Sequence, residues 1–142
     1  MDLTQSGMKS AEELRREHAA LQELLCEVRQ ALDELSGGAL LKVLEEFHRV
    51  VDDHFQREEE DGVFDDAVSL APRLSQRATA LMRQHPALLT TVEELVEMAR
   101  RDKEPREITE RFEIFAKKWL NHESEENKLL QEAYCLDLGA MD

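Results

Sequence analysis

The sequence predicts an all-α protein folded as an up-down-up-down antiparallel four-helix bundle. The 142 residues include only 5 Gly and 3 Pro, and the rest is dominated by residues that favour helices. Four long segments carry apolar residues at intervals of three and four. No segment alternates apolar and polar residues between turn signals, as a strand would. We expect a single domain over 1–142, with the bundle at about 10–134.

The first two helices are predicted on either side of a glycine pair. The first helix opens at Ser10, where Glu13 three residues later completes a capping box. It ends at Gly37 and Gly38, because glycine readily takes the backbone conformation that terminates a helix. The second helix then runs from about 39 to 60.

The other two long helices follow the one mid-chain break that is rich in turn residues. This connection covers 61–74 and is expected to contain a short helical turn at about 63–70. The third long helix is predicted at about 75–101 and the fourth at about 105–134. Short turns within each pair of helices favour antiparallel neighbours.

Composition limits the possible partners. A net charge of −14 argues against nucleic acid, because phosphate contacts need clustered Lys and Arg. No stretch approaches the roughly 18 consecutive apolar residues of a membrane span, so we expect no membrane partner and a cytoplasmic protein. The charge, without a spare apolar face, favours a monomer. Cys26 and Cys135 are too few and too far apart for a disulfide framework, and Cys26 is expected in the core.

Four of the five histidines lie on the apolar stripes, one in each predicted long helix: His18, His54, His85 and His122. A single histidine on such a stripe is usually a satisfied core residue. At about 1.5 Å per residue, however, all four lie about 24 to 28 Å from the short turn at one end of their helix. In an antiparallel bundle they therefore meet at one level, toward the end that carries the 61–74 connection.

Two glutamates join this histidine layer. Glu58 and Glu126 each follow a histidine by four residues, which places them one turn further along the same helix face. Buried carboxylates need cations as partners. Four imidazoles and two carboxylates, without Lys or Arg, predict a two-metal site in which the carboxylates can bridge. Without thiolate ligands, the donor set favours iron first, and then manganese or zinc.

Two other metal-binding patterns do not fit the sequence. Ferritin-like di-iron sites use two Glu-x-x-His motifs, whereas only Glu45 and His48 have that spacing here. His48 lies about 120° around the helix from His54, so we expect it at the surface or behind a ligand rather than on a metal. The His-Glu-x-x-His motif of zinc metalloproteases is absent.

Over about 10–134 the chain resembles the hemerythrin-like (hemerythrin HHE cation-binding) domain family. The resemblance rests on six residues in the family's order, with the repeated spacing His-x-x-x-Glu: His18, His54, Glu58, His85, His122 and Glu126. It implies a non-heme di-iron centre with a solvent-derived oxo or hydroxo bridge. It also implies that the histidines of the first two helices serve one iron, that those of the last two serve the other, and that the glutamates bridge.

The sequence departs from the oxygen-carrying members of that family. Those members have a fifth ligating histidine one turn from the position of His85, where this chain has Leu81 and Leu89. They also have His-x-x-x-x-Asp in the last helix, whereas this chain has the His-x-x-x-Glu of the wider bacterial and cytosolic branch. Each iron would then have about five ligands, one fewer than an octahedral site prefers. The candidates for a further ligand, otherwise exposed positions, are Glu123, Glu59 and Gln84.

Pro86, directly after His85, predicts a kink in the third long helix. Such a kink either re-aims His85 and opens a path for a ligand, or is simply tolerated.

Three functions are compatible with this pattern. The favoured one is binding of dioxygen or a related small diatomic ligand, for sensing, storage or delivery. Its expected pocket is apolar and is lined by Leu21, Val51, Leu81, Leu89 and Trp119. The alternatives are a di-iron redox enzyme handling peroxide or nitric oxide at open metal positions, and an iron- or redox-responsive module whose metal loading sets its stability. The sequence leaves open whether the protein is an enzyme.

Overall fold

A computed structural model describes residues 3–134, and the side chains of residues 11–134. Five α-helices and one short 3-10 helix follow in chain order: α1 (Leu3–Glu34), α2 (Gly37–Asp61), α3 (Val63–Leu70), η1 (Pro72–Leu74), α4 (Ser75–Arg100) and α5 (Pro105–Tyr134). Residues 3–134 contain no strand. The predicted all-α class is confirmed.

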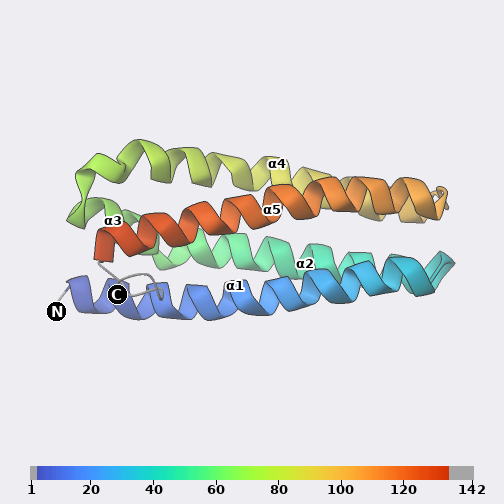
Figure 1. Ribbon diagram of the computed structural model, residues 1–142, viewed down its shortest axis with the longest axis horizontal. Coiled ribbons are helices and arrows are strands. Elements are labelled where there is room, and N and C mark those ends of the chain that lie inside the picture. The colour runs from blue at the N-terminus through green and yellow to red at the C-terminus, as the bar shows by residue number, and fades with distance from the viewer. Residues whose placement is uncertain (1–2, 135–142) are drawn as a thin grey trace.

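The four long helices α1, α2, α4 and α5 lie side by side (Figure 1). Contacts join α1 to both α2 and α5, and α4 to both α2 and α5. The α1–α2 and α4–α5 connections lie at one end of the molecule, and α3 lies at the other (Figure 1). Residues at similar distances from the two short connections are therefore brought to the same level.

The helix boundaries differ from the sequence-based expectation at one end of α1. This helix begins at Leu3, so Ser10 lies inside it and the predicted N-terminal capping position is wrong. The glycine pair lies at the start of α2, where extended Ser36 is the N-cap and Gly37 has a φ of 56°. Gly62 has a φ of 69° and separates α2 from α3, because glycine adopts this left-handed conformation without a steric cost.

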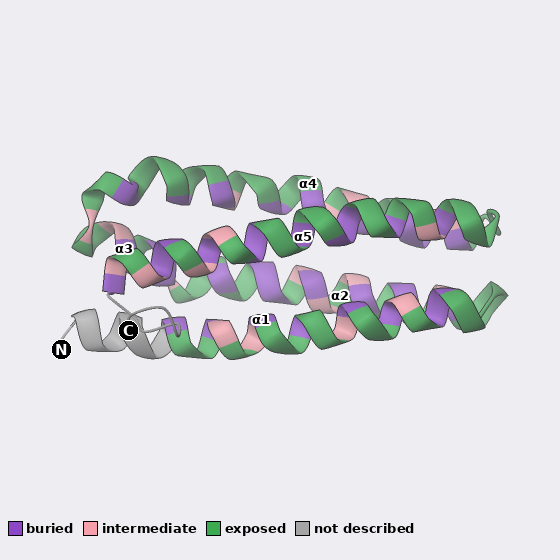
Figure 2. Cartoon of the chain, in the orientation of Figure 1, coloured by how far each residue is buried: buried purple, intermediate pink, exposed green. Residues whose placement is uncertain are grey.

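Apolar side chains form two clusters, on either side of a polar layer. The larger cluster lies toward the two short connections and contains a group of buried aromatic side chains: Phe47, Phe55, Phe112, Phe115 and Trp119. The smaller one joins Val63 and Phe64 of α3 to the far ends of α1, α4 and α5. On α1 the clusters end at Leu14 and Leu21, which flank buried His18. Figure 2 shows the buried residues recurring along one side of each helix.

Cys26 is exposed on α1, so its expected place in the core is wrong. It follows the buried Leu25 by one residue, and one residue is a turn of about 100° around a helix. Cys135 lies outside the described residues. Among the helices of residues 3–134, none combines the length and the apolar character that crossing a membrane requires.

Candidate metal centre

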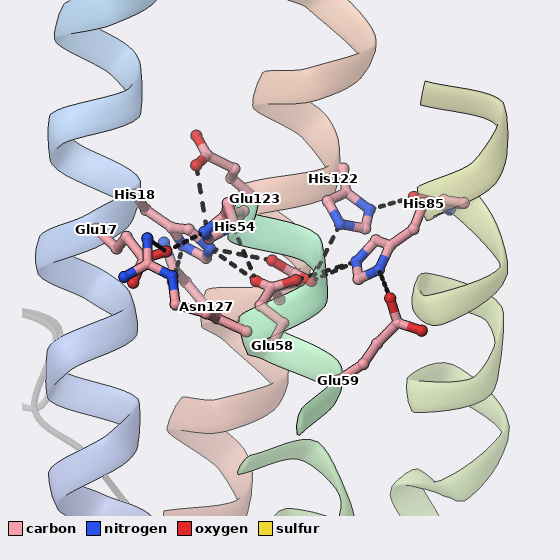
Figure 3. A network of polar contacts seen from close by, with 12 residues as sticks. Glu17, His18, His54, Glu58, Glu59, His85, His122, Glu123 and Asn127 are labelled. Atoms are coloured by element: carbon pink, nitrogen blue, oxygen red, sulfur yellow. Dashed lines mark hydrogen bonds and ion pairs between the residues drawn. The ribbon is translucent and has the colours of Figure 1, made fainter. Parts of the chain in front are cut away.

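The structure brings the six predicted site residues together in the polar layer between the two apolar clusters (Figure 3). Each long helix contributes one histidine, and α2 and α5 each add a glutamate. All six side chains are buried, with exposed fractions between 0% and 3%. The level predicted from helix lengths is therefore the level at which these side chains meet.

The six residues form two groups that share both glutamates. One group contains His18 and His54 with Glu58 and Glu126, and the other contains His85 and His122 with the same two glutamates. In each group, four donor atoms lie within 4.8 Å of one another. Two adjacent ions with two shared carboxylates would fit this arrangement.

Each glutamate directs one carboxylate oxygen toward each group. Glu58 Oε2 lies 3.1 Å from His54 Nε2, and Glu58 Oε1 lies 3.0 Å from His85 Nε2. Glu126 Oε1 lies 3.1 Å from His18 Nε2, and its Oε2 lies 3.0 Å from His122 Nε2. This arrangement would let each carboxylate bridge two ions.

The contact geometry fits a metal better than a network of hydrogen bonds. Two neighbouring ligands that bind one ion at about 2.1 Å and a right angle lie about 3 Å apart. Although its contacts are that short, the layer leaves four central atoms without a partner in hydrogen-bond geometry: His54 Nε2, His122 Nε2, Glu58 Oε1 and Glu126 Oε1. Buried polar atoms are normally satisfied, so these nitrogens and oxygens fit donors arranged around cations.

The outer ring nitrogen of each histidine contacts a side-chain oxygen. Glu17 Oε1 lies 2.6 Å from His54 Nδ1, and Gln84 Oε1 lies 2.7 Å from His122 Nδ1. Asn127 Oδ1 lies 3.0 Å from His18 Nδ1, and Glu59 Oε2 lies 3.5 Å from His85 Nδ1. When Nδ1–H donates to these oxygens, the lone pair of Nε2 faces the centre, as a metal ligand requires.

The two glutamates make the centre strongly attractive to positive charge. Burial opposes protonation of His18, but contacts with Glu126 and Glu58 outweigh it and raise the pKa of His18 to about 10. In the same way, burial lowers the pKa of His54 and of His85, but carboxylate contacts raise each to about 9. Burial also disfavours charge on Glu58, yet contacts with three histidines hold its pKa well below the ordinary value. A metal cation would replace protons here.

The three candidates for a further ligand have different positions. Gln84 and Glu59 face the outer nitrogens of His122 and His85, away from the shared carboxylates. Glu123 instead lies inside the bundle with 1% of its surface exposed, and its Oε2 lies 4.0 Å from His18 Nε2. Burial raises the pKa of Glu123 to about 7, although nearby His18 and His54 act to lower it.

Two surface grooves reach the edge of the layer. One, of about 320 Å³, lies between α1 and α2 and is lined by Glu17, Leu21, His54 and Arg57 among others. The second, of about 220 Å³, is lined by Glu58 and by residues around Gly62. The groove beside Pro86 contains none of the six site residues, and α4 continues through that proline.

The apolar lining expected for a ligand pocket is divided between different environments. Leu21, Val51 and Trp119 belong to the larger cluster, and Leu89 packs against it. Of these, only Leu21 also lines the groove at His54. Leu81 belongs to the smaller cluster. His48 is half-buried and belongs to neither of the two groups of possible metal ligands. It lines a separate groove between α2 and α4.

A buried cluster of four histidines and two shared glutamates, held by four long helices, defines a helical protein with a site that can hold metal cations. The chain matches the hemerythrin HHE cation binding domain over residues 9–134 and belongs to that family. Searches of curated proteins and of solved structures find no significant match.

Proposed function

We propose that this chain is an up-down-up-down four-helix bundle that holds two iron ions in its polar layer. His18 and His54 would bind one ion, His85 and His122 the other, and Glu58 and Glu126 would bridge them. The single observation that carries this proposal is the orientation of the two carboxylates: in each, one oxygen contacts the His18–His54 pair and the other contacts the His85–His122 pair. Nitrogen and carboxylate donors without thiolate suit iron among the available metals.

We further propose that the centre binds dioxygen or a related small diatomic ligand, for sensing, storage or delivery. Iron at such a centre would supply a reversible change of oxidation state and a coordination position for the ligand. The protein's own part is to position the donors and exclude water. Phe55 and Trp119 are buried beside the histidines, with the Trp119 ring centroid 5.9 Å from that of His54. This shell favours a small uncharged ligand over a polar substrate.

The alternative is a redox enzyme that handles peroxide or nitric oxide. The observation in its favour is the number of protein donors. Each metal-binding group has four residues, which leaves room in a six-coordinate site for a substrate as well as a solvent bridge.

Oxygen titration separates these functions. The protein would be loaded with Fe²⁺ without oxygen, exposed to measured amounts of dioxygen, and returned to an oxygen-free buffer. Binding predicts a visible absorption change that reverses over several cycles. Irreversible oxidation in the first cycle would contradict reversible binding, and steady consumption of peroxide or nitric oxide that is lost in Glu58→Gln would favour the enzyme.

A further inference from the structure

The centre is built from two halves related by an internal repeat. Five polar residues of one half have counterparts with the same contacts in the other half: His18 with His85, His54 with His122, Glu58 with Glu126, Glu17 with Gln84, and Asn127 with Glu59. In each half, the residue that precedes the first histidine in the chain contacts Nδ1 of the second histidine: Glu17, before His18, contacts His54. Gln84, before His85, contacts His122. The residue that follows each shared glutamate contacts Nδ1 of the first histidine of one half: Glu59, after Glu58, contacts His85. Asn127, after Glu126, contacts His18.

This repeat is broken at the residue that follows His54 and His122. In α2 that residue is Phe55, and in α5 it is Glu123. The Phe55 ring is stacked on the imidazole of His85, with ring centroids 4.0 Å apart and an interplanar angle of 10°. Glu123 occupies the corresponding place beside His18, with its carboxylate next to the His18 and His54 rings (Figure 3).

Glu123 lacks a close charged partner that would balance a buried carboxylate. Its side chain is 1% exposed, and neither carboxylate oxygen has a partner in hydrogen-bond geometry. The neutral side chain of Gln22 is close enough to make a looser contact that lowers the pKa of Glu123, but it supplies no positive charge. Among residues 11–134, no Lys or Arg forms an ion pair with it. The nearby groups that can carry positive charge are the imidazoles of His18, whose Nε2 lies 4.0 Å from Glu123 Oε2, and of His54. Burial of a carboxylate without a charged partner is unfavourable, so the presence of Glu123 at this position calls for a cation.

We propose that Glu123 is an additional oxygen ligand on the His18–His54 side, so that the two metal positions are unequal. This inference rests on the proposed two-metal function. The His18–His54 position would have two imidazoles and three carboxylates. The His85–His122 position would have two imidazoles and only the two shared carboxylates, with Phe55 in place of a third. The exchangeable position for a small ligand would therefore lie on the Phe55 side.

Glu123→Gln tests this proposal because it keeps the shape of the side chain and removes the negative charge. Co²⁺ is a suitable probe, since its visible absorption depends on coordination number. Wild type and variant would be titrated with Co²⁺ under anaerobic conditions, and heat release and absorption would be followed together. Glu125→Gln is the matched control, because it removes a more exposed carboxylate from the same stretch of α5.

In wild type, we expect two binding events with different absorption per ion. In Glu123→Gln, one event should weaken by at least about tenfold, and the other should keep its affinity and its spectrum. The metal-free variant should melt at the same temperature as wild type or higher, because a buried charge is removed. Glu125→Gln should resemble wild type in both titration and melting.

Two Co²⁺ ions bound with unchanged affinities and spectra in Glu123→Gln would overturn the proposal while leaving the two-metal function intact. A lower melting temperature without a change in Co²⁺ binding would also overturn it, since this result indicates a structural role only. If the variant does not fold, wild type still decides: two spectroscopically identical events would contradict unequal positions. Wild type that binds no Co²⁺ and no Fe²⁺ would refute the two-metal function itself.

Discussion

Glu58 Oε1 lies 3.0 Å from Nε2 of His85, a residue of a different helix, while the other oxygen of the same carboxylate faces His54 at 3.1 Å. One side chain of α2 thus reaches both halves of the polar layer. Glu126 repeats the arrangement from α5. Metal binding in the layer should therefore depend on each shared carboxylate more than on any single histidine.

Glu126→Ala should abolish binding of both metal ions. The glutamate belongs to both metal-binding groups and is fully buried, with 0% of its surface exposed. Removing it also leaves buried histidines without their carboxylate, a change that costs roughly 3–5 kcal/mol for a broken buried pair. Metal analysis after anaerobic iron loading and urea unfolding of the metal-free variant check the two effects. Retention of two ions per chain would show that Glu126 is not a bridge.

His54→Ala should lower the metal content to about one ion per chain, because the His85–His122 group keeps all four of its donors. The matched control is His48→Ala on the same helix, since His48 lies outside both groups. The control should bind as much metal as wild type. Equal metal content in wild type and His54→Ala would contradict the assignment of His54 as a ligand.

Glu17→Gln should weaken metal binding without removing a ligand. Glu17 Oε1 accepts a hydrogen bond from His54 Nδ1 at 2.6 Å, which holds the ring and makes Nε2 a better donor. Loss of such an outer contact typically costs about 10–100-fold in metal affinity. Competition with a chelator measures the change, with Glu23→Gln as a control on the same helix. An unchanged affinity would show that Glu17 does not orient His54.

The effect of pH on stability should depend on whether metal is bound. In the metal-free protein, the pKa values of His18, His54 and His85 are raised from 6.5 to about 10, 9 and 9. Protonation of these histidines then stabilises the fold fully below about pH 6.5, and the stabilisation is lost as pH rises through about 9 to 10. Metal binding instead requires neutral imidazoles and improves as protons leave.

Melting curves between pH 6.5 and 9.5 test this opposition. The metal-free protein should melt at progressively lower temperature as pH rises, while the increase in melting temperature produced by metal should grow. A metal-free protein whose melting temperature rises with pH over this range would contradict the carboxylate–imidazolium contacts of the polar layer.

The fold class and the meeting of the site residues could be predicted from the sequence because both follow from helix geometry. His18, His54, His85 and His122 lie at similar distances from two short turns, so an antiparallel arrangement brings them to one level. The start of α1 could not be placed, because Ser10 and Glu13 have the spacing of a capping box even though the helix extends back to Leu3. A capping box allows a helix to start at that position but does not prevent the helix from beginning earlier in the chain.

The contacts behind the histidines could not be assigned from residue type alone. Glu17 and Asn127 are polar residues with the same character as many exposed positions on their helices, and only the packed structure shows that they face His54 and His18. A signal was present in the spacing, because Glu17 and Gln84 directly precede a histidine of the layer, and Glu59 and Asn127 directly follow a glutamate of it. The residue type of Cys26 favours the core, but its position one residue after buried Leu25 turns its side chain to the surface.

The most direct test of the bridged two-metal centre is the iron content and Mössbauer spectrum of wild type loaded with Fe²⁺ without oxygen, desalted and then oxidised. We predict two iron ions per chain and a spectrum of a magnetically coupled pair, because the shared carboxylates hold the ions close together. One iron ion per chain or fewer, or two ions without magnetic coupling, would contradict the bridged centre.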